Sequence, residues 1–178
     1  RLTSGREEMA VSLRCPRFVF EGGTAGGALP TRIKGSLSRG EPLEVSYPVQ
    51  AIGTNGQFEV RLLLQWAASE GVLRKWAEFR LVDAPAPLLL KEVILEQVDM
   101  PGQKPQLEGR GVQSYPAFWR GFFAGVEFPV AATRLEGERL IVAHRPGWTL
   151  RNGEWHKSRK AVFGVAPEGS ERKQFARY

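Results

Sequence analysis

Apolar and polar residues alternate with a period of two along much of this chain. Every second residue from Phe58 to Trp66 is apolar, while Glu59 and Arg61 fall on the other side. Such alternation is typical of a strand with one buried face. A similar run covers 43–49, and the Asn55-Gly56 pair between the two runs predicts a hairpin.

The next run, residues 74–81, has one mixed face and one largely charged face. Pro85 and Pro87 end it, because proline donates no hydrogen bond to a sheet. Residues 88–98 carry apolar positions at helical spacing, but their β-branched residues and turn-bounded neighbours favour a strand. One face of the run before the prolines carries Lys75, Ala77, Phe79 and Leu81, and the other carries Arg74, Trp76, Glu78 and Arg80.

Short apolar runs separated by turn residues fill the rest of the chain. Their spacing is typical of sandwiches and barrels. The chain lacks the alternation of helices and strands that would indicate a parallel sheet. We therefore predict an all-β fold, a large antiparallel β-sandwich formed by one domain over 1–178. A glycine-rich loop is expected at 22–27, and Ser170 is expected to cap a short helix at 171–178, with Phe175 and Tyr178 on one face. Further strands are predicted at 11–15, 17–20, 32–37, 118–123, 126–132, 140–144 and 161–166.

Charge and composition exclude several classes of function. The net charge is +6, but most cations stand singly among acidic residues, and only 157–160 and 172–177 are clustered. Nucleic-acid binders concentrate charge on one face or in a motif, so we expect no nucleic-acid partner. No apolar run approaches the length of a membrane span. The single cysteine, Cys15, excludes an internal disulfide and a cysteine-based metal cluster.

The sequence predicts no catalytic residue, metal or cofactor. His144 and His156 are the only two histidines, and they lie outside any H-E-x-x-H motif. There is no Gly-x-Ser-x-Gly elbow, and the glycines at 22–27 lack the context of a phosphate-binding loop. Glu127 and Glu154 could supply a glycosidase carboxylate pair only at a suitable separation, which the sequence does not give.

Two aromatic segments are candidates for sugar binding. In 118–129, alternation places Glu127 on the side of Trp119 and Phe123, where a carboxylate needs a partner. That partner is either a cation, Arg145 or Arg74, or a sugar hydroxyl.

The second segment places aromatic rings beside polar groups. Sugar rings stack on aromatic faces while their hydroxyls bond polar side chains. The alternative is that its tryptophans close the rim of the core. The segment contributes Arg145, Trp148, Trp155 and His156 as candidate carbohydrate-binding residues, beside Trp119 and Glu127.

Three stretches resemble the N-terminal β-supersandwich domain, with its galactose-mutarotase-like fold, of α-galactosidase-like glycoside hydrolases. They are Val72 to Leu88, which leads towards the acidic residues Glu96 and Asp99, then Gly121 to Pro129, and Lys160 to Pro167 followed by 175–178. The resemblance covers roughly residues 41–178 in degenerate motifs.

The resemblance implies a non-catalytic module that packs on a catalytic (β/α)₈ barrel. The barrel would follow in the parent protein and hold the catalytic carboxylates. The implied partners are a glycan or the chain's own catalytic domain, and the implied location is secreted or periplasmic.

Three other functions stay open. A stand-alone carbohydrate-binding module predicts that Trp148 and Trp155 are exposed and coplanar. A sandwich-fold epimerase or lyase acting on sugars requires His144, His156 and Glu127 to meet in one cleft. A scaffold protein would expose a large apolar patch instead.

Overall fold

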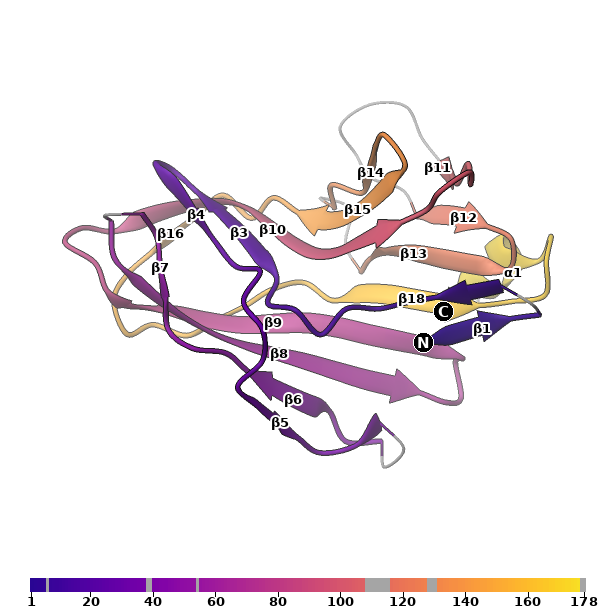
Figure 1. The fold of residues 1–178 in the computed structure, drawn as a ribbon, viewed down its shortest axis with the longest axis horizontal. Coiled ribbons are helices and arrows are strands. Elements are labelled where there is room, and N and C mark those ends of the chain that lie inside the picture. The colour runs from indigo at the N-terminus through magenta and orange to yellow at the C-terminus, as the bar shows by residue number, and fades with distance from the viewer. Residues whose placement is uncertain (6, 38–39, 54, 108–115, 128–130, 177–178) are drawn as a thin grey trace.

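The computed structural model describes residues 1–178 except 6, 38–39, 54, 108–115, 128–130 and 177–178. The described chain forms two large antiparallel sheets that enclose a common apolar interior, with one short helix near the C-terminus (Figure 1). The predicted β-sandwich is therefore confirmed.

The larger sheet contains ten strands among the described residues. Two short strands extend it beside the main path: β17 (His156–Lys157) pairs with β9 (Val72–Asp83), and β7 (Gln50–Ala51) pairs with β8 (Gln57–Ala67). The main path runs β11 (Gln106–Leu107), β12 (Ala117–Trp119), β13 (Phe122–Val126), β18 (Ala161–Val165), β9 (Val72–Asp83), β8 (Gln57–Ala67), β6 (Leu43–Ser46) and β5 (Arg32–Lys34).

The smaller sheet has six strands, and a separate two-stranded ribbon lies at the N-terminus. The ribbon pairs β1 (Leu2–Ser4) with β2 (Glu7–Met9). The smaller sheet runs β14 (Arg134–Glu136), β15 (Arg139–His144), β10 (Leu88–Asp99), β3 (Arg17–Phe20) and β4 (Gly23–Ala25), with β16 (Trp148–Leu150) also paired to β10.

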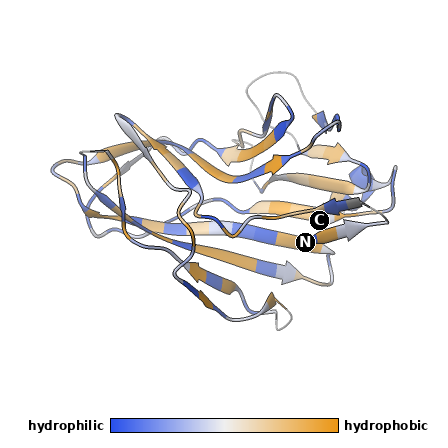
Figure 2. Ribbon diagram, viewed as in Figure 1, coloured by the Kyte–Doolittle hydropathy of each residue, from blue (hydrophilic) through white to orange (hydrophobic). Residues whose placement is uncertain are grey.

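The alternation of apolar and polar residues in β8 and β9 sets how the two sheets face each other. Figure 2 shows the bands of alternating hydropathy along these strands. Their inward residues meet residues from β3, so Phe18 lies 4.7 Å from Phe58 and 5.0 Å from Phe79 between ring centroids. All three rings are fully buried, and edge-to-face contacts of this kind stabilise a core beyond their buried area.

A β-bulge changes which residues of β10 face the interior. The pairing of β10 with β15 shifts between Ile94 and Glu96, which leaves Leu95 as the extra residue. Val93 belongs to the core before the bulge, Leu95 at the bulge itself, and Val98 after it. Because a bulge moves the alternation by one residue, Glu96 also turns into the interior.

Two predictions for the N-terminal part are wrong. Residues 11–15 form no strand but cross the gap between the sheets, and we call residues 10–16 the strap. The glycine-rich segment is not a simple loop, because Gly23–Ala25 pairs with β3. The predicted strand at 32–37 is shorter, since β5 ends at Lys34.

The predicted strand 118–123 is interrupted by a turn. Arg120 has φ +39° and Gly121 has φ +82°, so the chain reverses there and β12 pairs with β13. A side chain at Gly121 would meet the Ser4 hydroxyl, which makes glycine necessary at this turn. The predicted strand 126–132 lies partly outside the described residues.

The C-terminal helix α1 (Glu171–Phe175) covers part of the outer surface of the larger sheet. Phe175 packs on Phe118 and Phe123, with ring centroids 5.8 and 5.5 Å away. Ser170 does occupy the first capping position, but its hydroxyl donates to the Pro167 carbonyl rather than capping the helix. Tyr178, predicted on the same helix face, lies outside the described residues.

Candidate functional site

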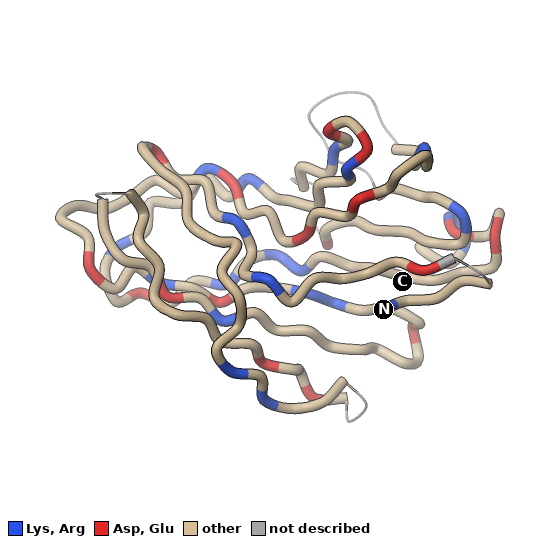
Figure 3. Tube along the Cα trace, in the orientation of Figure 1, with Lys and Arg blue, Asp and Glu red and all other residues tan. Residues whose placement is uncertain are grey.

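Aromatic and cationic side chains gather on the outer face of the larger sheet, away from the core. This face follows from the alternation in β8 and β9, which sends one set of residues inward and the other outward. Figure 3 shows basic residues both at the β5 edge and along the central strands. The outward set includes Arg61 on β8 and Arg74, Trp76 and Arg80 on β9.

Two arginines of this face place their guanidinium groups against the Trp155 ring. The Arg61 guanidinium carbon is 4.2 Å from the centre of this ring, and that of Arg80 is 4.8 Å away. Trp155 is nevertheless 39% exposed, and Arg80 is held by an ion pair of 2.7 Å with Glu59. An exposed indole fixed on charged neighbours makes a stacking platform with hydrogen-bond donors at its border.

Trp76 lies on the same face but is covered. Lys157 and Lys160 place their ammonium nitrogens 5.0 and 5.2 Å from its ring, and the residue is only 4% exposed. Its indole nitrogen has no hydrogen-bond partner among the described residues. The lysine stems therefore shield Trp76, and its ring has no free face for a ligand.

Trp148 and His156 are half-buried at the rim of the core, on the side of the larger sheet opposite Trp155. The Trp148 ring stacks near Phe79 at 6.4 Å and lies about 6 Å from both His144 and His156. His156 is itself stacked on Phe79 at 6.0 Å. Trp148 and Trp155 thus do not form a shared coplanar surface, and Trp148 is part of the core rim.

His144 is 2% exposed, and its ring is unsuited to proton transfer near neutral pH. Burial, together with the charge of Arg159, lowers the pKa of His144 to about 4. The Nε2 atoms of His144 and His156 are both buried without a hydrogen-bond partner in the described chain. The carboxylate of Glu154 lies 3.9 Å from His156 Nε2, beyond hydrogen-bonding distance.

Glu127 and Arg145 are both engaged in ion pairs. Glu127 accepts a 3.0 Å hydrogen bond from Arg74, one of the two cations that the sequence offered as partners. Glu127 shares its face with Phe123, but not with Trp119, because the turn at Arg120 reverses the alternation.

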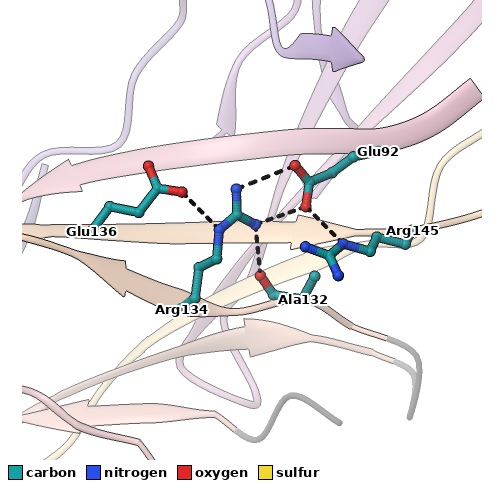
Figure 4. A network of polar contacts seen from close by, with 5 residues as sticks. All are labelled: Glu92, Ala132, Arg134, Glu136 and Arg145. Atoms are coloured by element: carbon teal, nitrogen blue, oxygen red, sulfur yellow. Dashed lines mark hydrogen bonds and ion pairs between the residues drawn. The ribbon is translucent and has the colours of Figure 1, made fainter. Parts of the chain in front are cut away.

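Arg145 instead contacts Glu92 on the other sheet. Figure 4 shows Arg134 and Arg145 converging on the Glu92 carboxylate. Arg145 lies 3.2 Å from Glu92, and Arg134 contacts both carboxylate oxygens at 2.7 and 3.2 Å. Arg134 also reaches Glu136 and the Ala132 carbonyl. Glu92 is only 8% exposed, so this network gives a buried carboxylate its counter-charges.

Trp119 borders a cavity of about 830 Å³ near the strap. The cavity lies between residues 8–17 and the second half of β10. It begins beyond Ile94, the last residue of β10 that pairs with β3. Trp119 is 7% exposed and packs on Phe122 at 5.9 Å. The position of Trp119 indicates a core residue at the cavity wall.

A buried ion pair crosses the interior at this cavity. Lys75 from the larger sheet is 3.0 Å from Glu96 of the smaller sheet, and their side chains are 1% and 3% exposed. Lys75 also donates to the Ser12 carbonyl, and Glu96 accepts from the Ser12 amide, both at 2.7 Å. Burial lowers the pKa of Lys75, while Glu96 opposes the shift. The pair ties the strap to both sheets.

Cys15 and Tyr47 lie in the same polar region. Gln50 donates to the Cys15 sulfur at 3.1 Å, and the Tyr47 hydroxyl donates to the Leu13 carbonyl at 2.7 Å. Burial raises the pKa of Cys15 to about 11, so the thiol stays protonated near neutral pH.

The proposed acid–base trio does not form one site. His144 and His156 flank Trp148 at the rim of the core, whereas Glu127 is bonded to Arg74 on the outer face of the larger sheet. Within the described residues, no three His, Cys, Asp or Glu side chains gather as a metal site. No described helix is long and apolar enough to cross a membrane.

Sequence reasoning singled out Trp155 but missed the arginines beneath it and the buried ion pair. The alternation had already placed Lys75 on one face with Ala77, Phe79 and Leu81. A lysine in such a row is a usable signal for a buried counter-charge. Comparison with protein-family models, curated proteins and solved structures finds no match to this chain.

Proposed function

We propose that this chain is a non-catalytic β-sandwich module of a carbohydrate-active enzyme, a glycoside hydrolase, and that it contacts a glycan. The observation that carries the proposal is the Trp155 platform: an indole that is 39% exposed and supported by Arg61 and Arg80. Sugar rings present C–H groups that stack on such a face, and their hydroxyls accept from neighbouring guanidinium groups.

The arrangement of titratable groups supports a module without catalysis of its own. A general base near neutral pH needs a pKa close to 7, and His144 has a pKa of about 4. Glu127 is held by Arg74 and Glu92 by two arginines, so these carboxylates serve as counter-charges. In this proposal the reaction belongs to a catalytic domain, and the sandwich positions the substrate.

A stand-alone carbohydrate-binding module is the second candidate, because the Trp155 platform would serve it equally well. The natural gene product distinguishes the two functions. A product that continues past Tyr178 into alternating strands and helices favours the accessory module, and one without a catalytic domain favours the stand-alone module. Intact mass spectrometry of the natural protein makes this distinction.

Glycan binding by the chain is testable by affinity electrophoresis in gels that contain soluble polysaccharides. We expect retardation by at least one polysaccharide, loss of retardation in Trp155→Ala, and partial recovery in Trp155→Phe. Leu135→Ala is a matched control, because Leu135 is also 39% exposed but lies on the smaller sheet. Equal retardation of all variants would refute the role of Trp155.

A further inference from the structure

The outer face of the larger sheet brings together cations that are far apart in the sequence. Arg32 on β5 is opposite Ser46, Ser46 is opposite Arg61, and Arg61 is opposite Glu78, which also faces Lys157. Directly paired residues point to the same side of a sheet. These positions therefore form a row across five strands, which spans about 19 Å at the usual strand spacing.

A second row lies two residues further along each strand, and a third row, on the other side of the first, contains the Trp155 platform. In the second row Lys34 is opposite Glu44, Glu44 is opposite Leu63, and Leu63 is opposite Trp76, over which Lys160 lies. In the third row Glu59 is opposite Arg80, beneath Trp155.

The three rows carry more positive than negative charge. We call this surface the cationic face; its charged members are Arg32, Lys34, Arg61, Arg80, Lys157 and Lys160 against Glu44, Glu59 and Glu78. Within these rows the excess is three cations, while Arg74, also on the outer face, is balanced by Glu70 and Glu127. Charges that alternate singly along the sequence thus become one patch because the strands pair.

We propose that the cationic face binds an anionic polysaccharide, whose sugar rings carry carboxylate or sulfate groups. This inference rests on the proposed function and names the class of glycan. Trp155 would stack on one sugar ring while the neighbouring cations meet the acidic groups of adjacent rings. Guanidinium groups suit this role, because their planar donors match carboxylate and sulfate oxygens.

Several cations of the face are fixed before any ligand arrives. Arg61 and Arg80 are stacked under Trp155, and the Lys157 and Lys160 ammonium groups are held over Trp76. Side chains that are already ordered lose less entropy on binding. The geometry thus favours a ligand with repeated charges along an extended chain.

A nucleic acid is also a polyanion, but the face suits it less well. Proteins that bind single strands stack successive bases on several aromatic rings. Within the described residues of this face, Trp155 is 39% exposed, whereas Trp76 is 4% exposed and covered by lysines. A broad sheet face also presents no helix or two-stranded ribbon that would enter a duplex groove.

The test compares three polysaccharides and one nucleic acid by isothermal titration calorimetry. The probes are polygalacturonate, dextran sulfate, neutral dextran and a single-stranded oligothymidylate. At 50 mM NaCl we expect roughly tenfold or more tighter binding of one of the charged polysaccharides than of dextran. Raising NaCl to 200 mM should weaken that binding by about tenfold, because bound counterions are released on association.

Variants separate a specific face from general attraction between opposite charges. Arg32→Gln/Lys34→Gln removes two exposed cations at the sheet edge without touching Trp155, and should weaken polyanion binding roughly fivefold. Lys104→Gln/Lys173→Gln removes the same charge at exposed positions elsewhere and should change it less than about twofold. Trp155→Ala keeps every cation and should weaken binding roughly tenfold.

Each of the remaining outcomes overturns this inference, and one of them overturns the proposed function as well. Equal binding of dextran and the charged polymers, lost in Trp155→Ala, would overturn the anionic class while leaving the proposed function standing. Equal losses in the Arg32→Gln/Lys34→Gln and Lys104→Gln/Lys173→Gln double variants, or no loss in Trp155→Ala, would mean non-specific attraction and overturn the inference. Tighter binding of the oligothymidylate would overturn it in favour of nucleic acid. Binding of no polysaccharide would overturn both proposals.

Discussion

The two ends of the sandwich interior solve the same packing problem with different chemistry. At one end β3, β8 and β9 fill the space with the rings of Phe18, Phe58 and Phe79, all fully buried. At the other end β3 has ended, and a cavity of about 830 Å³ is bridged by the Lys75–Glu96 pair. We call these the aromatic end and the polar end.

The difference shows how each end depends on its partners. Aromatic packing is stabilised by area and shape, so it weakens in proportion to what is removed. A buried ion pair carries a large desolvation cost that its mutual attraction must offset, so removing one partner is far worse than removing both. The polar end is therefore specified by a match between two residues rather than by volume.

The largest effect is expected from breaking the aromatic end. Phe58→Ala removes a ring that contacts Phe18, Phe20 and Phe79, and should lower the free energy of unfolding by about 4 kcal/mol. Urea denaturation followed by circular dichroism measures the loss. Phe58→Leu is the control and should lose less than half as much, because it leaves a smaller cavity.

At the polar end, a double substitution should cost less stability than a single substitution, contrary to the usual additive result. Glu96→Gln leaves the Lys75 ammonium buried without a counter-charge and should cost about 3 kcal/mol. Lys75→Met/Glu96→Leu removes both charges and should lie within about 1 kcal/mol of the unchanged protein. Urea denaturation of both variants tests this, and a double variant less stable than Glu96→Gln would contradict it.

Acidification should act on the aromatic end through His144. Its folded-state pKa of about 4 lies below the unfolded value of 6.5, so between these values only the unfolded state binds the proton. Stability should therefore fall as pH decreases from 6.5 to 4, by at most about 3 kcal/mol.

The matched variant for this effect is His144→Leu, which removes the titration, and His144 Nε2 has no hydrogen bond to lose within the described chain. Free energies of unfolding at pH 7, 5.5 and 4 should show a flatter pH dependence for the variant. Parallel curves would assign the pH dependence to other groups.

The smallest effect is kinetic and reports on the polar end. With a pKa of about 11 and 4% exposure, Cys15 should react slowly with a disulfide reagent at pH 8. Glu96→Gln loosens the strap that contains Cys15 and should speed labelling severalfold. Absorbance of the released thiolate measures the rate, and a Phe58→Leu variant with an equal rate increase would show general loosening instead.

Most of the fold could be predicted from the sequence where alternation is uninterrupted. The inward and outward faces of β9 follow directly from residue patterns, and the strand favoured at 88–98 over a helix is confirmed as β10. The strap could not be predicted, because its structure depends on Lys75 and Glu96, which are distant in the chain. β4 was missed for a local reason, because the glycines at 22–27 read as a loop although Gly23 pairs with Phe20 in a tight hairpin.

The candidate site was predictable only in part. Trp155 was identified as a residue, but its arginine supports are 75 and more positions away in the chain and come from other strands. The bulge at Leu95 likewise determines that Glu96 meets Lys75, and a single extra residue leaves no clear sign in the sequence. Such features appear only when strand register is known.

The strap also has a consequence for the order of folding. Ser12 bonds to residues 63 and 84 positions further along the chain, so neither contact can form until β9 and β10 exist. The loop-closure cost of such distant contacts falls late in folding. We expect the strap to settle after the strands that follow it in the chain, with Ser12 protected from hydrogen exchange only after the two sheets have closed.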